Sequence, residues 1–342
     1  MMRKLLGVSG VVALLLGCGF YLIWMRSWGP VAGVVQTSSG TYSWGAKLLD
    51  ARTEAGGASL DGKLYVVGGI DSFAQTYQDF HSYDAGTDVW TRLPDFPYPI
   101  NHPGVTSDGR HIYVVGGFAP LGIRIRGFMF AQWDAYDRVF RYDLRSEEWT
   151  ELATMPEPRG AGGVAYGEGK IWYAGGINGT RELSASLYCL DIAKNQWNEM
   201  SPMQYPRDHL RMEYAEGSLY AISGRQDDMR FNLPYLERFE LETNEWSHLP
   251  DIPTPRGGFG SAVFDGKIYT FGGEAVWTCF DQVEAYNLRT HRWETHAGLP
   301  EARHGIIAAV IGQRIHLVSG GRHPRVSISG LHRIYTPKKS IK

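Results

Sequence analysis

Five arginines occupy equivalent positions of a repeated pattern, and the guanidinium group is well suited to binding anions. They are Arg52, Arg159, Arg207, Arg256 and Arg303. Four of them follow a tryptophan by ten residues, Arg52 follows Trp44 by eight, and Ile100 fills the remaining position. The planar, permanently charged fork of arginine matches carboxylate and phosphate oxygens. Converging side chains of this kind predict a face that attracts an anion.

Polar residues that follow six glycine-containing doublets extend the predicted site. The doublets are Gly68-Gly69, Gly116-Gly117, Gly175-Gly176, Ser223-Gly224, Gly272-Gly273 and Ser319-Gly320. The residues assigned to the ligand-binding set are Asp71, Asn178, Arg225, Glu274 and Arg322. They differ from one repeat to the next, and variation on a repeated frame is where we expect specificity to arise.

Three histidines lie in the same segments. His102 and His209 each follow a tryptophan by twelve residues, and His304 directly follows Arg303. Imidazoles near one another can bind a metal or move protons. Because no tight ligand spacing accompanies them, we favour packing between repeats and predict no metal and no cofactor. His209 is included in the ligand-binding set, and no catalytic residue is assigned.

Six similar segments must position these side chains. Their tryptophans are Trp44, Trp90, Trp149, Trp197, Trp246 and Trp293, which lie 46 to 59 residues apart. A period near 50 residues is typical of propellers and arrays. Within one unit, residues 258–293 are predicted to form four strands, with a hairpin turn at Asp265-Gly266 between the first two.

An apolar residue seven positions before the tryptophan marks the third strand in five units. These residues are Tyr83, Tyr142, Leu190, Phe239 and Tyr286. The sixth such residue is Tyr335, but position 342, seven residues later, is a lysine. We therefore expect Trp44 to complete that unit. The two ends of the chain would then pair and close the ring, which hides the sheet edges.

The doublet, the tyrosine and the tryptophan, repeated in this order from about residue 41, resemble the kelch repeat. The resemblance implies an all-β, six-bladed kelch β-propeller, similar to the central domain of galactose oxidase. Two departures stand out: two doublets read Ser-Gly, and one interval of 59 residues holds an apolar insertion at residues 119–133. That insertion could be a lid, a docking segment, a membrane contact or part of its own blade.

Because strands alternate in direction, two sets of loops should open on the same face. They are the leading loop, which precedes the first strand of each blade, and the doublet loop, which follows its doublet. In kelch propellers that capture acidic peptides, leading-loop arginines are ligand contacts, and the resemblance carries this role to Arg159, Arg207, Arg256 and Arg303. The alternative is that the arginines tie neighbouring blades together through carboxylates or backbone carbonyls.

An apolar N-terminal segment predicts a membrane anchor. Residues 5–25 carry no charge and follow Arg3 and Lys4, and a helix of that length spans a bilayer core of ~30 Å. We predict one N-terminal hydrophobic helix within a signal-anchor or signal peptide at residues 1–26, a linker at 27–41 and the propeller at 42–342. The basic residues place the propeller on the extracytoplasmic side, periplasmic or extracellular. A lipobox-like sequence ending at Cys18 offers lipid anchoring as an alternative.

Composition and the resemblance together suggest function. A formal net charge of −2 gives no footprint for nucleic acid. We predict a membrane-tethered binding or scaffold module for an anionic ligand or acidic protein segment, rather than an enzyme. Kelch-like propellers also include a copper oxidase and an iron-dependent nitrile-specifier, whose residue patterns we do not find here. The enzymatic alternative is an acidic-sugar mutarotase or epimerase, with Glu274, Asp71 or His209 as acid and base.

Overall fold

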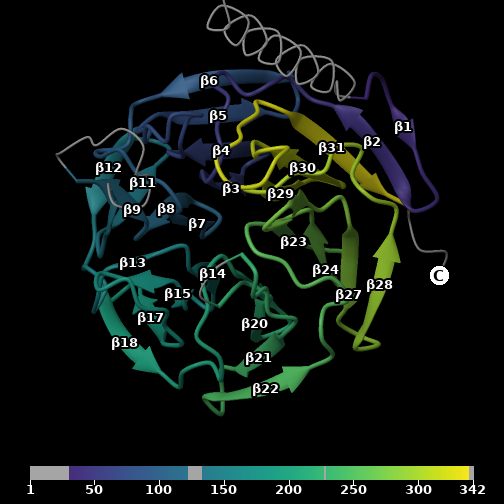
Figure 1. Cartoon of the computed structure of the whole chain (residues 1–342). Helices are drawn as coiled ribbons and strands as arrows, with labels where there is room; N and C mark the ends of the chain where they lie inside the picture. Colours follow the sequence, from purple (N-terminus) through teal and green to yellow (C-terminus); the bar gives the residue numbers. More distant parts are fainter. Residues whose placement is uncertain (1–30, 122–132, 227–228, 339–342) are drawn as a thin grey trace, which may run out of the picture. The chain divides into compact units, whose positions relative to one another are not determined.

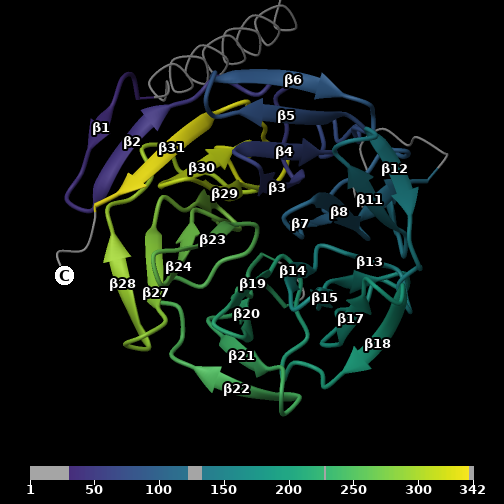
Figure 2. The ribbon, with the colours of Figure 1, turned by 180° about the vertical axis from the view of Figure 1, so that it is seen from behind.

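Every regular element in the described part of the chain is a β-strand. The computed structural model describes residues 31–121, 133–226 and 229–338. The chain divides into two units, Met1–Gly33 and Val34–Lys342, and the second unit is a six-bladed β-propeller. Figure 1 views this propeller along its axis, and Figure 2 shows it from behind.

Each blade is an antiparallel sheet whose first strand lies near the axis and whose outermost strand lies at the rim (Figure 1). Blade 1 consists of β3 (Gly56–Leu60), β4 (Lys63–Val67), β5 (Phe80–Asp84) and β6 (Val89–Leu93). Blade 2 consists of β7 (Gly104–Ser107), β8 (His111–Val115), β11 (Val139–Asp143) and β12 (Glu148–Glu151). Blade 3 consists of β14 (Gly163–Gly167), β15 (Lys170–Ala174), β17 (Leu187–Asp191) and β18 (Gln196–Met200).

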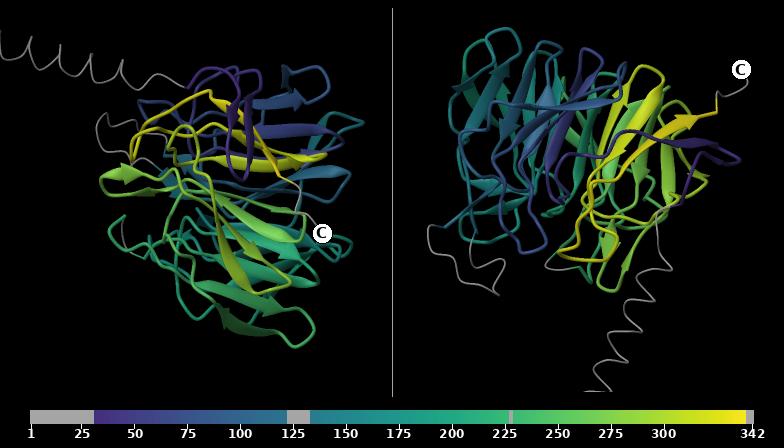
Figure 3. Two further views of the ribbon diagram at one scale, coloured as in Figure 1. Left: turned by 90° about the vertical axis from the view of Figure 1, so that its right-hand side faces the viewer. Right: turned by 90° about the horizontal axis from the view of Figure 1, so that it is seen from above.

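The other three blades repeat this arrangement, with strands that run between the two faces of the propeller (Figure 3). Blade 4 consists of β19 (Arg211–Ala215), β20 (Ser218–Ile222), β21 (Leu236–Glu240) and β22 (Glu245–Leu249). Blade 5 consists of β23 (Gly260–Phe264), β24 (Lys267–Phe271), β27 (Val283–Asn287) and β28 (Arg292–His296). Blade 6 consists of β29 (Ile307–Ile311), β30 (Arg314–Val318), β31 (His332–Pro337), β2 (Gly40–Trp44) and β1 (Val35–Gln36). Short ladders in the loops join β9 (Phe118–Pro120) to β10 (Trp133–Ala135), β13 (Arg159–Gly160) to β16 (Ile177–Asn178), and β25 (Glu274–Ala275) to β26 (Thr278–Cys279).

The all-β, six-bladed propeller is confirmed, but the N-terminal hydrophobic helix must be removed from the predicted fold class. The described residues contain no helix, and residues 1–26, on which that prediction fell, lie outside them. None of the residues from 31–121, 133–226 and 229–338 forms a helix with the length and apolar character of a membrane span. An apolar run permits a helix without requiring one, because helix stability also depends on what packs around it. The extracytoplasmic location stays a prediction.

Two further predictions concern the borders of the propeller. Strands β1 and β2 begin at Val35 and Gly40, so the propeller unit starts inside the predicted linker at residues 27–41. The insertion begins and ends in the ladder between β9 and β10. Its central part, residues 122–132, lies outside the described residues, and its proposed roles stay predictions.

The tryptophans join each blade to the preceding one. In five blades the tryptophan lies opposite the predicted third-strand residue, as Tyr83 does opposite Trp90. Four of the indole nitrogens donate a hydrogen bond of 2.7 to 2.8 Å to a backbone carbonyl that follows the outer strand of the preceding blade. Each of these four indole rings therefore packs its apolar face between two blades while its N–H keeps a hydrogen-bond acceptor.

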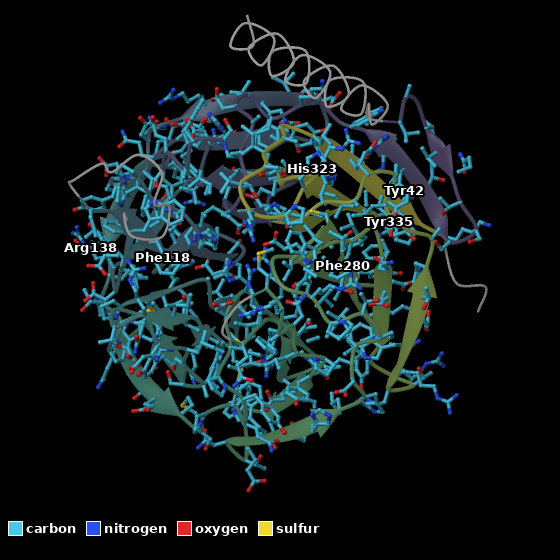
Figure 4. The ribbon with its side chains drawn as sticks, viewed as in Figure 1. Tyr42, Phe118, Arg138, Phe280, His323 and Tyr335 are labelled. Carbon is cyan, nitrogen blue, oxygen red and sulfur yellow. The ribbon has the colours of Figure 1, made fainter. Side chains whose placement is uncertain are left out.

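Pairing of the chain ends closes the ring, as predicted, but with a different register. Strand β2 pairs with β31, and Tyr42 rather than Trp44 lies opposite Tyr335. The Tyr42 and Tyr335 rings stack with centroids 4.7 Å apart and lie together in Figure 4. Trp44 lies instead against Arg333, whose Cζ is 3.3 Å from the ring centroid. No turn joins these two strands, so side-chain packing sets their register.

The glycine doublets allow close contact between neighbouring blades. In all six blades, the second residue of the doublet donates its N–H to the carbonyl at the arginine position of the next blade, at 2.7 to 3.0 Å. A Cβ on Gly116 would lie 2.4 Å from the Arg159 carbonyl oxygen. In the two Ser-Gly doublets, the serine hydroxyl donates to that same carbonyl, so Ser223 bonds to Arg256 and Ser319 bonds to Arg52, each at 2.8 Å.

Candidate functional site

The leading loop and the doublet loop of each blade pair at one face of the propeller. Five pairs are single bridges, such as Thr53 with Ile70 and Asp208 with Arg225, and the ladder of β13 with β16 is the sixth. Both sets of loops therefore open on the same face, as expected from the strand directions. We call this the loop face.

The five predicted arginines lie inside the blades rather than on the loop face. Their exposure is at most 1 %. In four blades the guanidinium donates to the carbonyl of the first doublet residue of its own blade: Arg52 to Gly68 at 2.9 Å, and Arg159 to Gly175, Arg256 to Gly272 and Arg303 to Ser319 at 2.8 Å. Arg207 donates to the Ala221 carbonyl instead, at 3.2 Å.

Carboxylates balance the charge of four of these arginines. The pairs are Arg52 with Asp79, Arg159 with Glu157, Arg207 with Glu237 and Arg256 with Glu284. Burial lowers the pKa of Arg256 to about 10 although Glu284 opposes the shift, so the guanidinium stays charged at neutral pH. The partners are the carboxylates and backbone carbonyls of the structural alternative, but these side-chain contacts lie within one blade, and the bond to the preceding blade is made by the arginine's backbone carbonyl. A ligand-binding role for the five arginines stays a prediction, and the site is built below from other residues.

A pocket of about 420 Å³ opens among the loops of this face. We call it the mouth pocket. Its polar lining includes Glu54, His102, Asp208, His209, Arg225 and Glu274. Its apolar lining includes Ile70, Phe118, Trp133, Ile177 and Val326. A cavity of this size, with apolar walls and a few converging polar groups, is typical of sites that hold a small molecule or a few side chains.

Glu54 is the centre of one half of the polar lining. Its Oε2 lies 3.3 Å from His102 Nε2, and its Oε1 lies 3.3 Å from His304 Nδ1. Burial lowers the pKa of His102 to about 3, so that ring is neutral at pH 7. Burial also opposes ionisation of Glu54, but the facing histidines, which include His304 with a pKa raised by Glu274 and Glu54, outweigh burial and hold the carboxyl pKa well below its usual value. Glu54 is therefore a buried carboxylate that faces the pocket.

Asp208 and Arg225 form the other half. Asp208 accepts a hydrogen bond of 2.7 Å from His209 Nδ1, and its Oδ1 lies 3.3 Å from Arg225 Nε. Arg225 also reaches Glu274, with Nη1 to Oε1 at 3.4 Å. Burial would raise the pKa of Asp208, but His209 and Arg225 lower it overall. The two carboxylates hold the Arg225 side chain at the edge of the pocket.

Six equivalent residues surround the axis directly below the mouth pocket. They are Glu54, His102, Ala161, His209, Gly258 and Gly305, and we call them the neck ring. Backbone hydrogen bonds of 2.5 to 3.2 Å link each of the last five to the one before it. Three members, Glu54, His102 and His209, line both the mouth pocket and a cavity of about 30 Å³ beneath it. A channel pocket of about 440 Å³ continues between the innermost strands.

Comparison with known proteins agrees with the repeats and the geometry. Residues 45–208 match the profile of the KLHDC2/KLHL20/DRC7 Kelch-repeats domain, and residues 255–299 match the Kelch motif. The chain belongs to the kelch-repeat family.

The curated kelch proteins that match this chain share only about a quarter of its residues over the aligned region, and they are longer than the chain. Kelch-like protein terF of Aspergillus terreus is 27 % identical, over 70 % of this chain and 53 % of its own length. Human Kelch-like protein 23 is 26 % identical, over 64 % of this chain and 37 % of its own. The chain thus spans about half or less of the length of these curated relatives. A solved structure described as YjhT has a TM-score of 0.73 at 12 % identity, covering 86 % of this chain and 99 % of that one, which shows the shared fold alone.

The structure gathers part of the predicted ligand-binding set of this kelch propeller. Asn178, His209, Arg225 and Glu274 line the mouth pocket together. Asp71 and Arg322 lie outside its lining, and Asp71 accepts backbone hydrogen bonds at 2.8 Å within its own loop. Sequence reasoning missed Glu54, which lies two residues after Arg52, the register that His209 has after Arg207. This equivalent position in the repeat was the sequence signal that could have identified Glu54.

Proposed function

We propose that this kelch propeller binds an acidic segment of a partner protein across its loop face, with side chains of the segment entering the mouth pocket. Kelch propellers are generally protein-binding scaffolds. The observation that carries the proposal for this chain is a set of aromatic side chains that protrude around the mouth. Phe73 and Trp277 are 90 % and 89 % exposed, and Phe231 is 52 % exposed.

All three aromatic residues belong to doublet loops, in blades 1, 4 and 5. Large apolar side chains left in water are costly, and such residues gathered at one face mark a binding surface. Exposed arginines accompany them on the doublet loops: Arg181, Arg230 and Arg325. Aromatic residues and arginine are the types enriched among residues that dominate protein interfaces, and arginine favours carboxylate partners.

The mouth pocket has carboxylates in its lining, and its arginines, Arg181, Arg225 and Arg325, are the groups that would receive an acidic side chain. Arg225 lines the pocket and lies between two carboxylates of the same chain. A carboxylate of the partner would compete with Asp208 or Glu274 for the Arg225 guanidinium group. The apolar lining offers burial to a neighbouring aliphatic or aromatic side chain. An acidic-sugar mutarotase or epimerase acting in the same pocket stays the alternative prediction.

The test is peptide binding by the full chain and two single variants. Acidic peptides that carry aromatic residues are screened, and dissociation constants of the binders are measured for the parent, Trp277→Ala and Val89→Ala. Loss of an interface anchor costs about 2 kcal/mol, which is a weakening of roughly 30-fold, so we expect this for Trp277→Ala. Val89 is the control, since it is 52 % exposed at the start of β6, next to the turn at the opposite face. Equal affinities for both variants, or no peptide that binds, would refute the proposal.

A further inference from the structure

The neck ring contains an unusual choice of residues for its backbone conformation. All six members have a left-handed φ, between 48° and 63°. This region favours glycine, because a Cβ crowds the backbone there. At three of the positions the chain has Ala161, Gly258 and Gly305, which have a single methyl group or no side chain. At the other three it places Glu54, His102 and His209, although glycine would relieve the strain.

The three large residues bring metal-binding atoms together at the axis. One carboxylate oxygen of Glu54 and one ring nitrogen each of His102 and His209 lie within 4.8 Å of one another. The small side chains at the other three positions leave room for them to meet. Two imidazoles with one carboxylate form the ligand set of catalytic zinc sites and of non-haem iron(II) sites.

Hydrogen bonds outside this triad fix which nitrogen of each ring is free. His102 Nδ1 lies 2.7 Å from Asn101 Oδ1, and the Nδ2 of that amide donates to Thr76. His209 Nδ1 lies 2.7 Å from Asp208 Oδ1. Both oxygens can only accept, so both Nδ1 atoms donate, which leaves Nε2 as the nitrogen of each neutral ring that can bind a metal. A metal-binding histidine usually donates the N–H of its other ring nitrogen to a carboxylate or carbonyl oxygen.

We propose that Glu54, His102 and His209 bind a divalent first-row transition-metal ion beneath the mouth pocket. His102 Nε2 and Glu54 Oε2 face each other at 3.3 Å, so a single metal ion could bind both atoms. Three protein ligands leave coordination positions open, and the pocket lies above them. The site does not depend on the proposed protein partner, although a carboxylate of a bound molecule could complete the coordination.

The experiment measures metal retained by the full chain after stripping with a chelator and reloading with Zn²⁺ or Co²⁺. We expect about one ion per chain, with a Co²⁺ absorption spectrum that reports nitrogen ligands. The His102→Ala and His209→Ala variants should bind at least tenfold more weakly. His248→Ala is the control, because His248 is half-exposed beside Asp251 and tests adventitious surface binding. Parent protein that retains no ion, or that binds no better than the two variants, overturns the proposal.

A second variant separates ligation from a merely structural role. Asp208→Asn keeps an oxygen acceptor near His209 but removes the charge that supports the ring as a ligand. Changes of this kind typically reduce metal affinity 10- to 100-fold, and we expect this range while the circular dichroism stays that of the parent. Unchanged Zn²⁺ affinity in Asp208→Asn would contradict the assigned tautomer and, with it, the triad.

Discussion

At the scale of the residue, each of the five leading-loop arginines connects two blades at once. Its guanidinium donates to carbonyls of its own blade, while its backbone carbonyl accepts the doublet N–H of the preceding blade. Arg256 shows the complete arrangement: Nη1 bonds to Gly272, Nη2 lies 2.5 Å from Glu284, and the backbone oxygen accepts from Gly224. The Nε of Arg256 also donates to the Thr254 carbonyl at 2.9 Å, and an opposite charge with such hydrogen bonds offsets the cost of removing the guanidinium from water.

The Arg256→Gln variant tests this connecting role. It leaves Glu284, which is 2 % exposed, without its cation, and an unpaired buried charge of this kind costs about 3 to 5 kcal/mol. We therefore expect the urea midpoint of unfolding to fall accordingly. Arg289→Gln, at an exposed turn position, is the control and should change stability by about 0.5 kcal/mol or less. Similar losses in both variants would show that the buried pair contributes little.

At the scale of the element, most of the fold was predictable and the site only partly so. Four-strand blades follow from local signals: the Asp265-Gly266 turn and the seven-residue spacing before each tryptophan. The direction of a leading-loop side chain has no such local signal. A repeated arginine fits both a ligand site and an internal tie, and only packing reveals that Arg207 is buried against Glu237. Likewise, Glu54 and His209 converge only because distant blades meet at the axis.

The closing blade contains a pair of buried histidines that should make stability depend on pH. His316 Nδ1 lies 2.9 Å from His332 Nε2, and His332 Nδ1 lies 3.0 Å from the carbonyl of Ala46, just after β2. Burial lowers the pKa of His316 to about 4 and that of His332 to about 3. Both values lie below the unfolded value of about 6.5, so the unfolded chain binds more protons between these limits.

The sign of this linkage is that the stabilisation is complete above about pH 6.5 and is lost as the pH falls toward 4 and then 3. For His316 alone, the loss between pH 7 and pH 5 is on the order of 2 kcal/mol. We expect His316→Gln to remove about that much of the acid sensitivity in urea unfolding at the two pH values. His248→Gln, which alters an exposed ring, should leave the sensitivity unchanged, and an equal effect of both would contradict the assignment.

At the scale of the whole propeller, stability depends on one seam made from the two ends of the chain. Five blades are continuous in sequence, but blade 6 combines β29, β30 and β31 with β2 and β1. Opening that seam exposes the edge of β31 and removes the partner of Tyr335. That the ends must pair was predictable from the missing sixth tryptophan. The register was not, because no loop between the strands constrains it.

A disulfide across the seam should therefore stabilise the propeller more than one placed within a blade. Thr41 lies opposite Thr336 in the ladder of β2 and β31, and facing residues of an antiparallel pair have Cα separations that a disulfide can bridge. The native Cys189 and Cys279 are free and buried, so they should not compete, and Cys18 is replaced by serine in every variant. Closing a loop of about 300 residues predicts a gain in stability of up to ~5 kcal/mol in the oxidised Thr41→Cys, Thr336→Cys double variant.

Thermal unfolding of the oxidised and reduced forms measures this gain in stability, with each single variant as a control. If the oxidised form unfolds at the same temperature as the reduced one, then unfolding begins at another blade and the seam is not the weakest point of the ring.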